Sequence, residues 1–308
     1  MNNDFGLTLS QIRKSKGITQ EELAYDICTR KYLSNIENGR QTPTVLKLEQ
    51  LSNKLGVDLS SIYHLSLYSN PYDTKKKIEH MDELFKHRKF LELRKLIIEC
   101  EHSNDFQIPI NQQLIVLYKA MNAYELDQNL AESKSLLEQA FAVTNKTNIL
   151  EIKCDRQLTY IDSRILISYS KILIENNHLE DGLKLLTTIE ECLLKTYLGN
   201  SDSRGEILLK AMFNKAFLLN EKSEYDTALV SIEEGIDKSI IQNNLTLLSN
   251  FYYLKGVIKF NTKVLDEAES LFNMFLSLRL ALKDTKYFKV MKEFIEESYG
   301  FHYDFHIK

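Results

Sequence analysis

Short stretches with apolar residues at helical spacing fill the first 65 positions of the chain. Leu9 and Ile12, three apart, are the first such pair, and the same interval recurs further on. Apolar residues at intervals of three and four line one face of a helix. The pattern therefore predicts five short helices. Their expected bounds are Leu7 to Lys16, a helix begun by Thr19, about Thr29 to Asn38, Pro43 to Leu55, and Val57 to Leu65.

The second and third predicted helices are separated by a tight bend. Thr19 and Glu22, three apart, form a capping box at the start of the second helix. Leu33 and Ile36 are the inward pair of the third helix, and Gly39 ends it. This arrangement turns four polar residues outward: Arg30, Lys31, Ser34 and Asn35. Arg and Lys match guanine O6 and N7 in the major groove, and Asn matches adenine N6 and N7, so the pattern indicates a helix-turn-helix.

The first and fourth predicted helices complete a small core around this bend. In the first helix, Leu9 and Ile12 are expected to point inward, and Arg13, Lys14 and Lys16 outward. In the fourth, we expect Val45, Leu48 and Leu51 to be buried. Asn70-Pro71 is the clear break that follows, since proline disfavours helix at the residue before it. The expected organisation is a DNA-binding domain at 1–66, a linker at 67–73 and a second domain at 74–308.

Helical segments beyond the break arrive in pairs, and their second members share a pattern. Those members begin at Phe90, Leu130, Leu179, Tyr225 and Leu265, separated by 40, 49, 46 and 40 residues. In the last two pairs, Ala216 and Ala228, then Gly256 and Ala268, are each twelve apart. This spacing resembles the tetratricopeptide (TPR) repeat, in which a small residue on each helix lets the pair cross closely. The resemblance implies five degenerate units over 74–283, closed by a helix at about Thr285 to Ser298, in a right-handed superhelix with a concave wall.

Composition agrees with an all-α protein. The chain has 10 Gly, 3 Pro and 44% apolar residues in 308 positions. No apolar run approaches the roughly 18 residues that span a bilayer, so we expect a cytoplasmic protein without membrane contact. The net charge is −4, and residues 1–64 hold eight Lys or Arg against seven Asp or Glu. Non-specific DNA affinity should therefore be modest.

Motifs for catalysis are missing from the sequence. It contains no Gly-rich phosphate loop, nucleophile elbow or H-E-x-x-H motif, so we expect no enzymatic activity, no cofactor and no metal. The four cysteines, Cys28, Cys100, Cys154 and Cys192, are widely spaced and form no C-x-x-C pair. We expect each to be a reduced, small core residue. Oxidation of Cys28 could disturb DNA binding.

The first helix of each repeat is expected to line the concave wall, and the small residues set its register. The wall residues predicted in this way are Tyr118, Lys119 and Asn122; Arg164, Ile167, Ser168 and Lys171; Lys210, Phe213, Asn214 and Phe217; and Asn250, Tyr253 and Leu254. Asn side chains can hydrogen-bond an extended peptide backbone, Lys or Arg can hold a carboxylate, and aromatic rings can bury apolar side chains. The wall therefore predicts a peptide ligand.

The stretches from Ile18 to Ala24 (ITQEELA) and from Leu33 to Pro43 (LSNIENGRQTP) resemble the helix-turn-helix of the lambda-repressor/XRE group. One departure is Tyr25-Asp26-Ile27-Cys28, which replaces the usual glycine-containing bend. The resemblance implies that Arg13 pairs with Glu37, and that Gln20 contacts phosphate and Arg40 the DNA backbone. The base-reading positions that it implies are Arg30, Lys31 and Asn35, with Thr29 and Tyr32 beside them.

Nearly the whole chain resembles the RNPP family of quorum-sensing regulators, in particular its PlcR-type members. The resemblance is most specific in FNKAFLL, SEYDTALVSIEEGI and FYYLKG, in that order, between Phe213 and Gly256. It implies a homodimer that binds a short signalling peptide on its concave surfaces and a palindromic operator in double-stranded DNA. Asn214, with Asn250 as a second, would hold the peptide backbone, and Tyr63 or Tyr68 on the linker would close the site. The linker from Tyr63 to Asp73 would change the spacing of the DNA-binding domains.

Two other functions remain open at this point. One is a ligand-independent phage- or plasmid-type repressor that uses its repeats only for dimerisation. The other is a TPR protein-interaction module, like the peptide-controlled Rap-type proteins. The helix-turn-helix argues against the module, and the polar and aromatic wall favours ligand control over the simple repressor.

Overall fold

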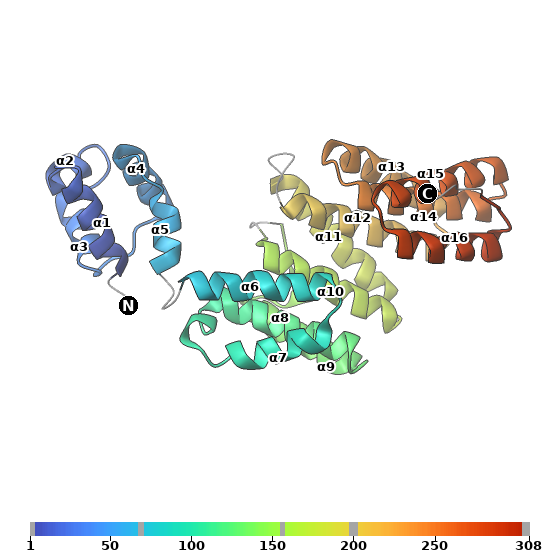
Figure 1. The fold of residues 1–308 in the computed structure, drawn as a ribbon, viewed down its shortest axis with the longest axis horizontal. Coiled ribbons are helices and arrows are strands. Elements are labelled where there is room, and N and C mark those ends of the chain that lie inside the picture. Colours follow the sequence, from blue (N-terminus) through green and yellow to red (C-terminus); the bar gives the residue numbers. More distant parts are fainter. Residues whose placement is uncertain (1–3, 67–70, 155–157, 197–202, 304–308) are drawn as a thin grey trace. The chain divides into compact units, whose positions relative to one another are not determined.

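The computed structural model of the chain describes residues 4–66, 71–154, 158–196 and 203–303, and within these ranges it contains helices and no strand (Figure 1). The expected all-α fold is thereby confirmed. Contacts group the chain into two compact units, Met1–Leu126 and Asp127–Lys308, and each is described by itself. The expected linker at 67–73 lies partly outside the described residues, and the domain boundary there stays a prediction. Tyr68 also lies outside them. No helix among the described residues is long and apolar enough to cross a membrane.

Five short helices begin the first unit, as the hydrophobic spacing predicts. They are α1 (Asp4–Ser15), α2 (Gln20–Ala24), α3 (Arg30–Glu37), α4 (Val45–Leu55) and α5 (Leu59–Ser66). Leu9, Leu23, Leu33, Ile36 and Leu51 form the centre of their core, each at most 1% exposed. The expected inward pair of α3 is confirmed. The capping box predicted at the start of α2 is also present.

Two expected orientations in this domain are wrong. Val45 is 81% exposed instead of buried, because it is the first residue of α4 and projects from that turn while Leu48 and Leu51 face the core. Arg13 is 7% exposed instead of pointing outward.

The bend that lacks glycine is made by Asp26, which takes a φ of 60°. Asp tolerates the left-handed region better than most residues, so it can replace glycine there.

A buried ion pair joins α1 to the end of α3. Arg13 Nε lies 2.6 Å from Glu37 Oε1 and Arg13 Nη2 lies 2.8 Å from Glu37 Oε2, and Arg13 Nη1 donates to the Ile18 carbonyl at 2.9 Å. A Cβ on Gly6 would lie 2.4 Å from the Ile36 carbonyl oxygen, so glycine lets the two helices approach this closely. Burial alone would raise the pKa of Glu37, but hydrogen bonds from Arg13 and a neighbouring amide lower it below its usual value. The pair that the resemblance implied is therefore formed.

Helix pairs build the remaining structure. In the first unit these are α6 (Pro71–Lys86) with α7 (Phe90–Cys100), followed by the 3-10 turn η1 (Asn104–Phe106) and α8 (Pro109–Glu125). The second unit contains α9 (Leu130–Ala142), η2 (Ile149–Glu151), α10 (Tyr160–Glu175), α11 (Leu179–Thr196), α12 (Ser203–Glu221), α13 (Tyr225–Ile241), α14 (Leu245–Asn261), α15 (Leu265–Ala281) and α16 (Thr285–Tyr299). All five starts predicted for the second helices coincide with helix starts in the structure.

A left-handed residue precedes each of these second helices by two positions. These residues, with φ between 50° and 67°, are Arg88, Gln128, Asn177, Ser223 and Lys263. Around Lys263, its backbone N–H donates to the Phe260 carbonyl and the N–H of Val264 donates to the Lys259 carbonyl. This is the hydrogen-bond pattern of a Schellman motif, which ends one helix and lets the next begin at once. The repeated turn explains why the helix pairs are regular although no glycine is present there.

Glycines let neighbouring helices of the second unit pack closely. A Cβ on Gly235 of α13 would lie 2.3 Å from the ring of Phe251 on α14. A Cβ on Gly256 of α14 would lie 2.9 Å from the ring of Phe272 on α15. Both rings are fully buried. Each aromatic ring therefore occupies the space that a side chain on the facing helix would need.

The cysteines differ from the expectation of four reduced thiols. Cys154 and Cys192 form a disulfide, with their Cα atoms 4.8 Å apart, whereas Cys28 and Cys100 are free. The expectation is wrong for the pair because 38 positions separate them in sequence, and only the packing of the segment before α10 against α11 brings them together. The spacing of the cysteines in the sequence does not predict this disulfide.

We predict that Glu37→Gln lowers the stability of the helix-turn-helix by about 3–5 kcal/mol at pH 7, because it leaves Arg13 buried without a counter-charge. The lowered pKa of Glu37 means that the wild-type advantage is full above the ordinary carboxyl range and is lost as the pH falls through the folded-state value. Urea unfolding at pH 7 and in steps down to acid pH measures both effects. Glu49→Ala, at an exposed position of α4, is the control and should change stability by less than about 0.5 kcal/mol. A constant difference at all pH values would contradict the ion-pair explanation.

We also predict that Gly235→Ala destabilises the second unit by about 1–3 kcal/mol, because the new methyl group overlaps the Phe251 ring. Better helix propensity would by itself favour alanine by about 1 kcal/mol, so the sign of the change tests the packing. Thermal unfolding measures it, with Glu234→Ala at the exposed neighbouring position as control. Adding Phe251→Leu should recover part of the loss. If Gly235→Ala were stabilising, the close contact would not exist in solution.

Candidate nucleic-acid interface and ligand-binding wall

The recognition helix α3 displays polar residues on its open side. The hydroxyl of Thr29 caps the helix by accepting from the Tyr32 N–H at 3.1 Å. Thr29, Arg30, Lys31 and Arg40 are exposed, and Asn35 is half-buried. Neither Arg30 nor Lys31 forms an ion pair with any residue that the structure describes. Their charges are therefore available for phosphates or base edges.

Two of the predicted contact residues also have partners inside the domain. Gln20 Nε2 donates to Glu37 Oε2 at 2.8 Å, and its second N–H remains for another acceptor. The Arg13–Glu37 pair thus orients the amide that the resemblance assigns to phosphate. The hydroxyl of Tyr32 accepts from the Thr44 N–H at 3.3 Å and so links α3 to the start of α4. Tyr32 therefore contributes to the domain core as well as to its surface.

Lysines on α4 hold the bend, and the sequence offered no indication of this. Lys54 Nζ donates to the Tyr25 carbonyl at 2.8 Å and lies 5.6 Å from the centre of the Tyr25 ring. Lys47 Nζ donates to the Ile27 carbonyl and lies 3.1 Å from Gln50 Oε1. The carbonyl groups left open after α2 are thereby satisfied. The two contacts to the Ile27 and Tyr25 carbonyls join residues 20 and 29 positions apart, beyond what local spacing can show.

The first helices of the repeats lie side by side in the second unit. Helix α10 contacts α12, and α12 contacts α14, in addition to the contacts between successive helices. On α10, the predicted wall residues Arg164, Ile167 and Ser168 are half-buried and Lys171 is exposed. Their intervals of three and four place them on one helix face. Two neighbouring helices can thus present one continuous surface.

The face of α12 is the most open part of this wall. Phe217 is 45% exposed, and Lys210 is exposed with its ammonium group 2.6 Å from Glu206. Phe213 is half-buried and meets Phe251 edge-on at 5.6 Å between ring centres. Asn214, between the two aromatic residues, is half-buried, and its amide has no hydrogen-bond partner among the described residues. An amide in this setting can both donate to and accept from a bound backbone.

The predicted residues on α14 are engaged inside the protein. Asn250 Oδ1 accepts from Arg279 of α15, a residue that is 6% exposed and lies 4.7 Å from the centre of the Tyr287 ring. The Tyr253 hydroxyl is 3.5 Å from that of Tyr299, and burial together with this contact raises the pKa of Tyr253. Leu254 is 1% exposed, so its expected place on an open surface is wrong. The aromatic cluster around α16 encloses this part of the wall.

The predicted residues on α8 belong to the first unit. Tyr118 is fully buried, with its hydroxyl bonded to Asp82 of α6, so the expectation that it lines an open surface is wrong. Lys119 is partly exposed and pairs with Glu101. Asn122 is 3% exposed, and neither atom of its amide group has a partner among the described residues. Helix periodicity placed these residues on one face but did not show that α6 covers part of it.

Solved structures with a similar fold match nearly the whole chain. Bacillus thuringiensis PlcR in complex with the peptide PapR7 and DNA is 21% identical, with a TM-score of 0.70 over 94% of this chain and 98% of that one. The Streptococcus dysgalactiae SHP pheromone receptor Rgg2 is 15% identical, with a TM-score of 0.58 over 95% of this chain and 99% of that one. At these identities the likeness establishes the fold.

Two sequence matches to curated proteins each cover less than a fifth of the chain. An uncharacterized HTH-type transcriptional regulator, y4dJ, of Sinorhizobium fredii is 43% identical over 53 residues, which are 17% of this chain and 69% of that protein. The control protein C.MunI of a Mycoplasma species is 39% identical over 61 residues, 19% of this chain and 82% of that protein.

Family models divide the chain into two matched regions. The helix-turn-helix family matches residues 9–62, which include α2, the bend and α3. The model of the RNPP family C-terminal domain matches residues 75–296, more than two thirds of the chain. This family and fold are those of transcription regulators and not of enzymes. With both regions in order along one polypeptide, the chain belongs to the RNPP family.

Proposed function

We propose that the protein is a cytoplasmic, DNA-binding transcription regulator whose activity is controlled by a short signalling peptide bound on the concave face of its TPR-like domain. The observation that carries this proposal is the open face of α12, where Asn214 has no hydrogen-bond partner in the part of the chain that the structure describes and Phe217 is exposed. A protein that used its repeats only for packing or dimerisation would have no need for an unpaired amide between aromatic side chains. The titles of similar structures support the same function, because they describe PlcR with PapR7 and DNA, and ComR with DNA and its signalling peptide ComS.

The chemistry of the wall defines the kind of peptide. The Asn214 amide would pair with the peptide backbone, and Phe213 and Phe217 would cover an apolar side chain. Arg164 and Lys171 on the neighbouring α10 could hold a carboxylate. Asn250 would join them only if Arg279 released its amide oxygen. We therefore propose an extended peptide with at least one apolar side chain and a free carboxylate.

DNA would be read by a homodimer. Arg30, Lys31 and Asn35 of α3 would face the bases, and Gln20 and Arg40 the phosphates. A two-fold dimer places its recognition helices in half-sites about 34 Å apart, or a multiple of that, so the operator should be palindromic. Peptide can change DNA affinity only by preferring one arrangement of the two DNA-binding domains. The domains at 1–66 and 74–308, with the linker at 67–73 between them, would provide that change.

A DNA titration with and without peptide tests the proposal. Fluorescent DNA from the region upstream of the gene is titrated with the full chain at fixed salt, alone and with the small-peptide fraction of spent culture medium. A peptide-dependent shift in affinity or footprint supports the proposal. The proposal would fail if the protein bound DNA tightly and neither the peptide fraction nor synthetic peptides encoded by small reading frames beside the gene changed its affinity. That result would favour a constitutive repressor.

We predict that Arg30→Ala or Lys31→Ala weakens binding to the specific operator by about 1–3 kcal/mol if the side chain contacts a base edge. Anisotropy titrations on operator and on scrambled DNA measure the change. Lys289→Ala, an exposed position of α16, has the same change in charge and should leave both affinities unaltered. An equal loss on operator and scrambled DNA would assign the residue to phosphate contact.

We predict that Asn214→Ala weakens peptide affinity by about tenfold or more and so removes most of the peptide response. DNA binding without peptide should stay at the wild-type level. Asn214 is half-buried and has no partner within the described ranges, so the fold should lose little stability. Asn273→Ala on the exposed side of α15 is the matched control. Unchanged peptide affinity in Asn214→Ala would place the ligand elsewhere.

A further inference from the structure

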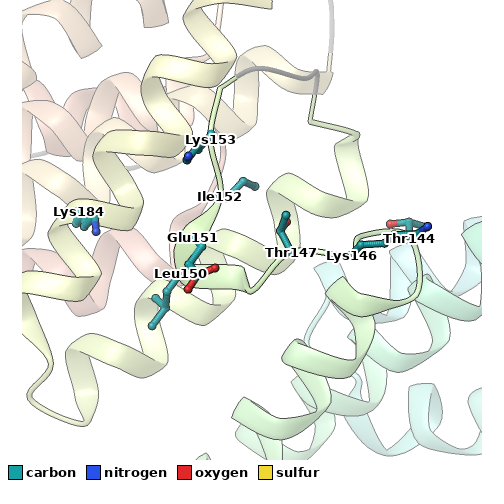
Figure 2. A pocket seen from close by; sticks show the side chains of 8 residues that line it. All are labelled: Thr144, Lys146, Thr147, Leu150, Glu151, Ile152, Lys153 and Lys184. Atoms are coloured by element: carbon teal, nitrogen blue, oxygen red, sulfur yellow. The ribbon is translucent and has the colours of Figure 1, made fainter.

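The segment from residue 144 to 154, between α9 and α10, lies against α11 over a hollow. The hollow measures about 940 Å³ and is lined by Thr144, Lys146, Thr147, Leu150, Glu151, Ile152, Lys153 and Lys184 (Figure 2). Figure 2 shows Lys184 on a helix across from Leu150 and Glu151, with Thr144 and Lys146 at the far end of the segment. Seven of these eight residues belong to the segment and Lys184 lies on α11, so the hollow leaves part of the segment without packing against the helix. Segments with few packing contacts open at low cost.

The segment is held at its start, in its middle and at its end. At its start, Asn145 Nδ2 donates to Asp162 Oδ1 at 2.9 Å and to the Phe141 carbonyl at 2.8 Å. In its middle, Ile149 and Ile152 are buried. At its end, Cys154 is linked to Cys192 on α11. The disulfide is thus the covalent attachment of the segment to the helix beside the hollow.

The two cysteines of the disulfide differ in exposure, and the two free cysteines have thiols of low reactivity. Cys154 is partly exposed, whereas Cys192 is 2% exposed. Burial raises the pKa of the Cys100 thiol to about 11 and also raises the pKa of Cys28. A thiol with a raised pKa holds little reactive thiolate near neutral pH. Chemistry with a small disulfide or thiol is therefore directed to Cys154.

We propose that Cys154 and Cys192 are a reversible thiol–disulfide modification site that clamps the 144–154 segment onto α11 when oxidised and releases it when reduced. The reaction partner is a low-molecular-weight thiol and its disulfide. In oxidation, the Cys154 thiolate attacks the small disulfide and releases one small thiolate. The Cys192 thiolate then attacks the Cys154 sulfur of the mixed disulfide and releases the second, so two electrons pass from the protein to the small disulfide.

The clamp has a physical connection to the proposed peptide wall. Cys192 lies two positions after Glu190 on α11, and Glu190 is buried with its carboxylate 2.9 Å from the ammonium group of Lys215 on α12. Lys215 directly follows Asn214 in the sequence. A shift of this part of α11 therefore reaches the residue that would hold the peptide. This consequence, unlike the clamp itself, rests on the proposed function.

The clamp is tested on the full chain by mass spectrometry and hydrogen exchange. The protein is reduced with dithiothreitol, or oxidised with glutathione disulfide and then returned to reductant. We expect a Cys154–Cys192 linked peptide only after oxidation, and amide exchange in 144–154 about tenfold or more slower in the oxidised form. Cys28→Ser is the matched control and should keep this difference. Cys154→Ser should lose it and exchange like the reduced wild type in both conditions.

Three outcomes would overturn the clamp: no Cys154–Cys192 link after oxidation, a link that excess reductant cannot open, or equal exchange of 144–154 in both forms. Comparison of the oxidised and reduced wild type decides this even if Cys154→Ser fails to fold. The connection to the wall is measured by repeating the DNA titration with the peptide fraction in both forms. We expect the peptide response to differ by about twofold or more in the wild type and not at all in Cys154→Ser. An equal response in both forms would overturn that connection, whereas no response in either form would count against the proposed function.

Discussion

Each helix pair of the second unit must bury its apolar face against the next pair, and the structure of the unit depends on this constraint. A pair of helices cannot cover that face alone, so pairs must stack and the stack must be close. Gly235 and Gly256 make the contacts from α13 to α15 close enough for Phe251 and Phe272 to fill the space between the helices. The same stacking sets α10, α12 and α14 side by side. The candidate ligand-binding wall is a consequence of this packing.

Polar residues of the second unit are divided between the fold and the wall. Lys215 on α12 pairs with the buried Glu190, and Lys222, in the turn after α12, pairs with Glu180. Both contacts tie this part of the chain to α11. Asn214, also on α12, has no partner among the described residues. On α14, by contrast, Asn250 is used by Arg279. The same residue type thus supports the fold on one helix and remains available on another.

The helix-turn-helix shows the same division at smaller scale. Arg13, Glu37 and Gln20 form a network that joins α1, the start of α2 and the end of α3, and the lysines of α4 hold the bend between α2 and α3. Because these contacts fix the helices, α3 can leave Arg30 and Lys31 without ion-pair partners among the residues that the structure covers. A rigid support for a few free cations is what sequence-specific recognition of a groove requires.

Sequence patterns were enough to predict the all-α class, the capping box at Thr19, the inward pair of α3 and the starts of the five second helices. These features depend on spacing and capping within a few residues, which the sequence displays directly. Three other features depend on how the helices pack: α6 covers Tyr118, Arg279 donates to Asn250, and Cys154 forms a disulfide with Cys192. Each of these contacts joins residues 29 to 38 positions apart. Periodicity assigns a residue to a helix face, but the neighbour that covers that face is set by how the helices pack.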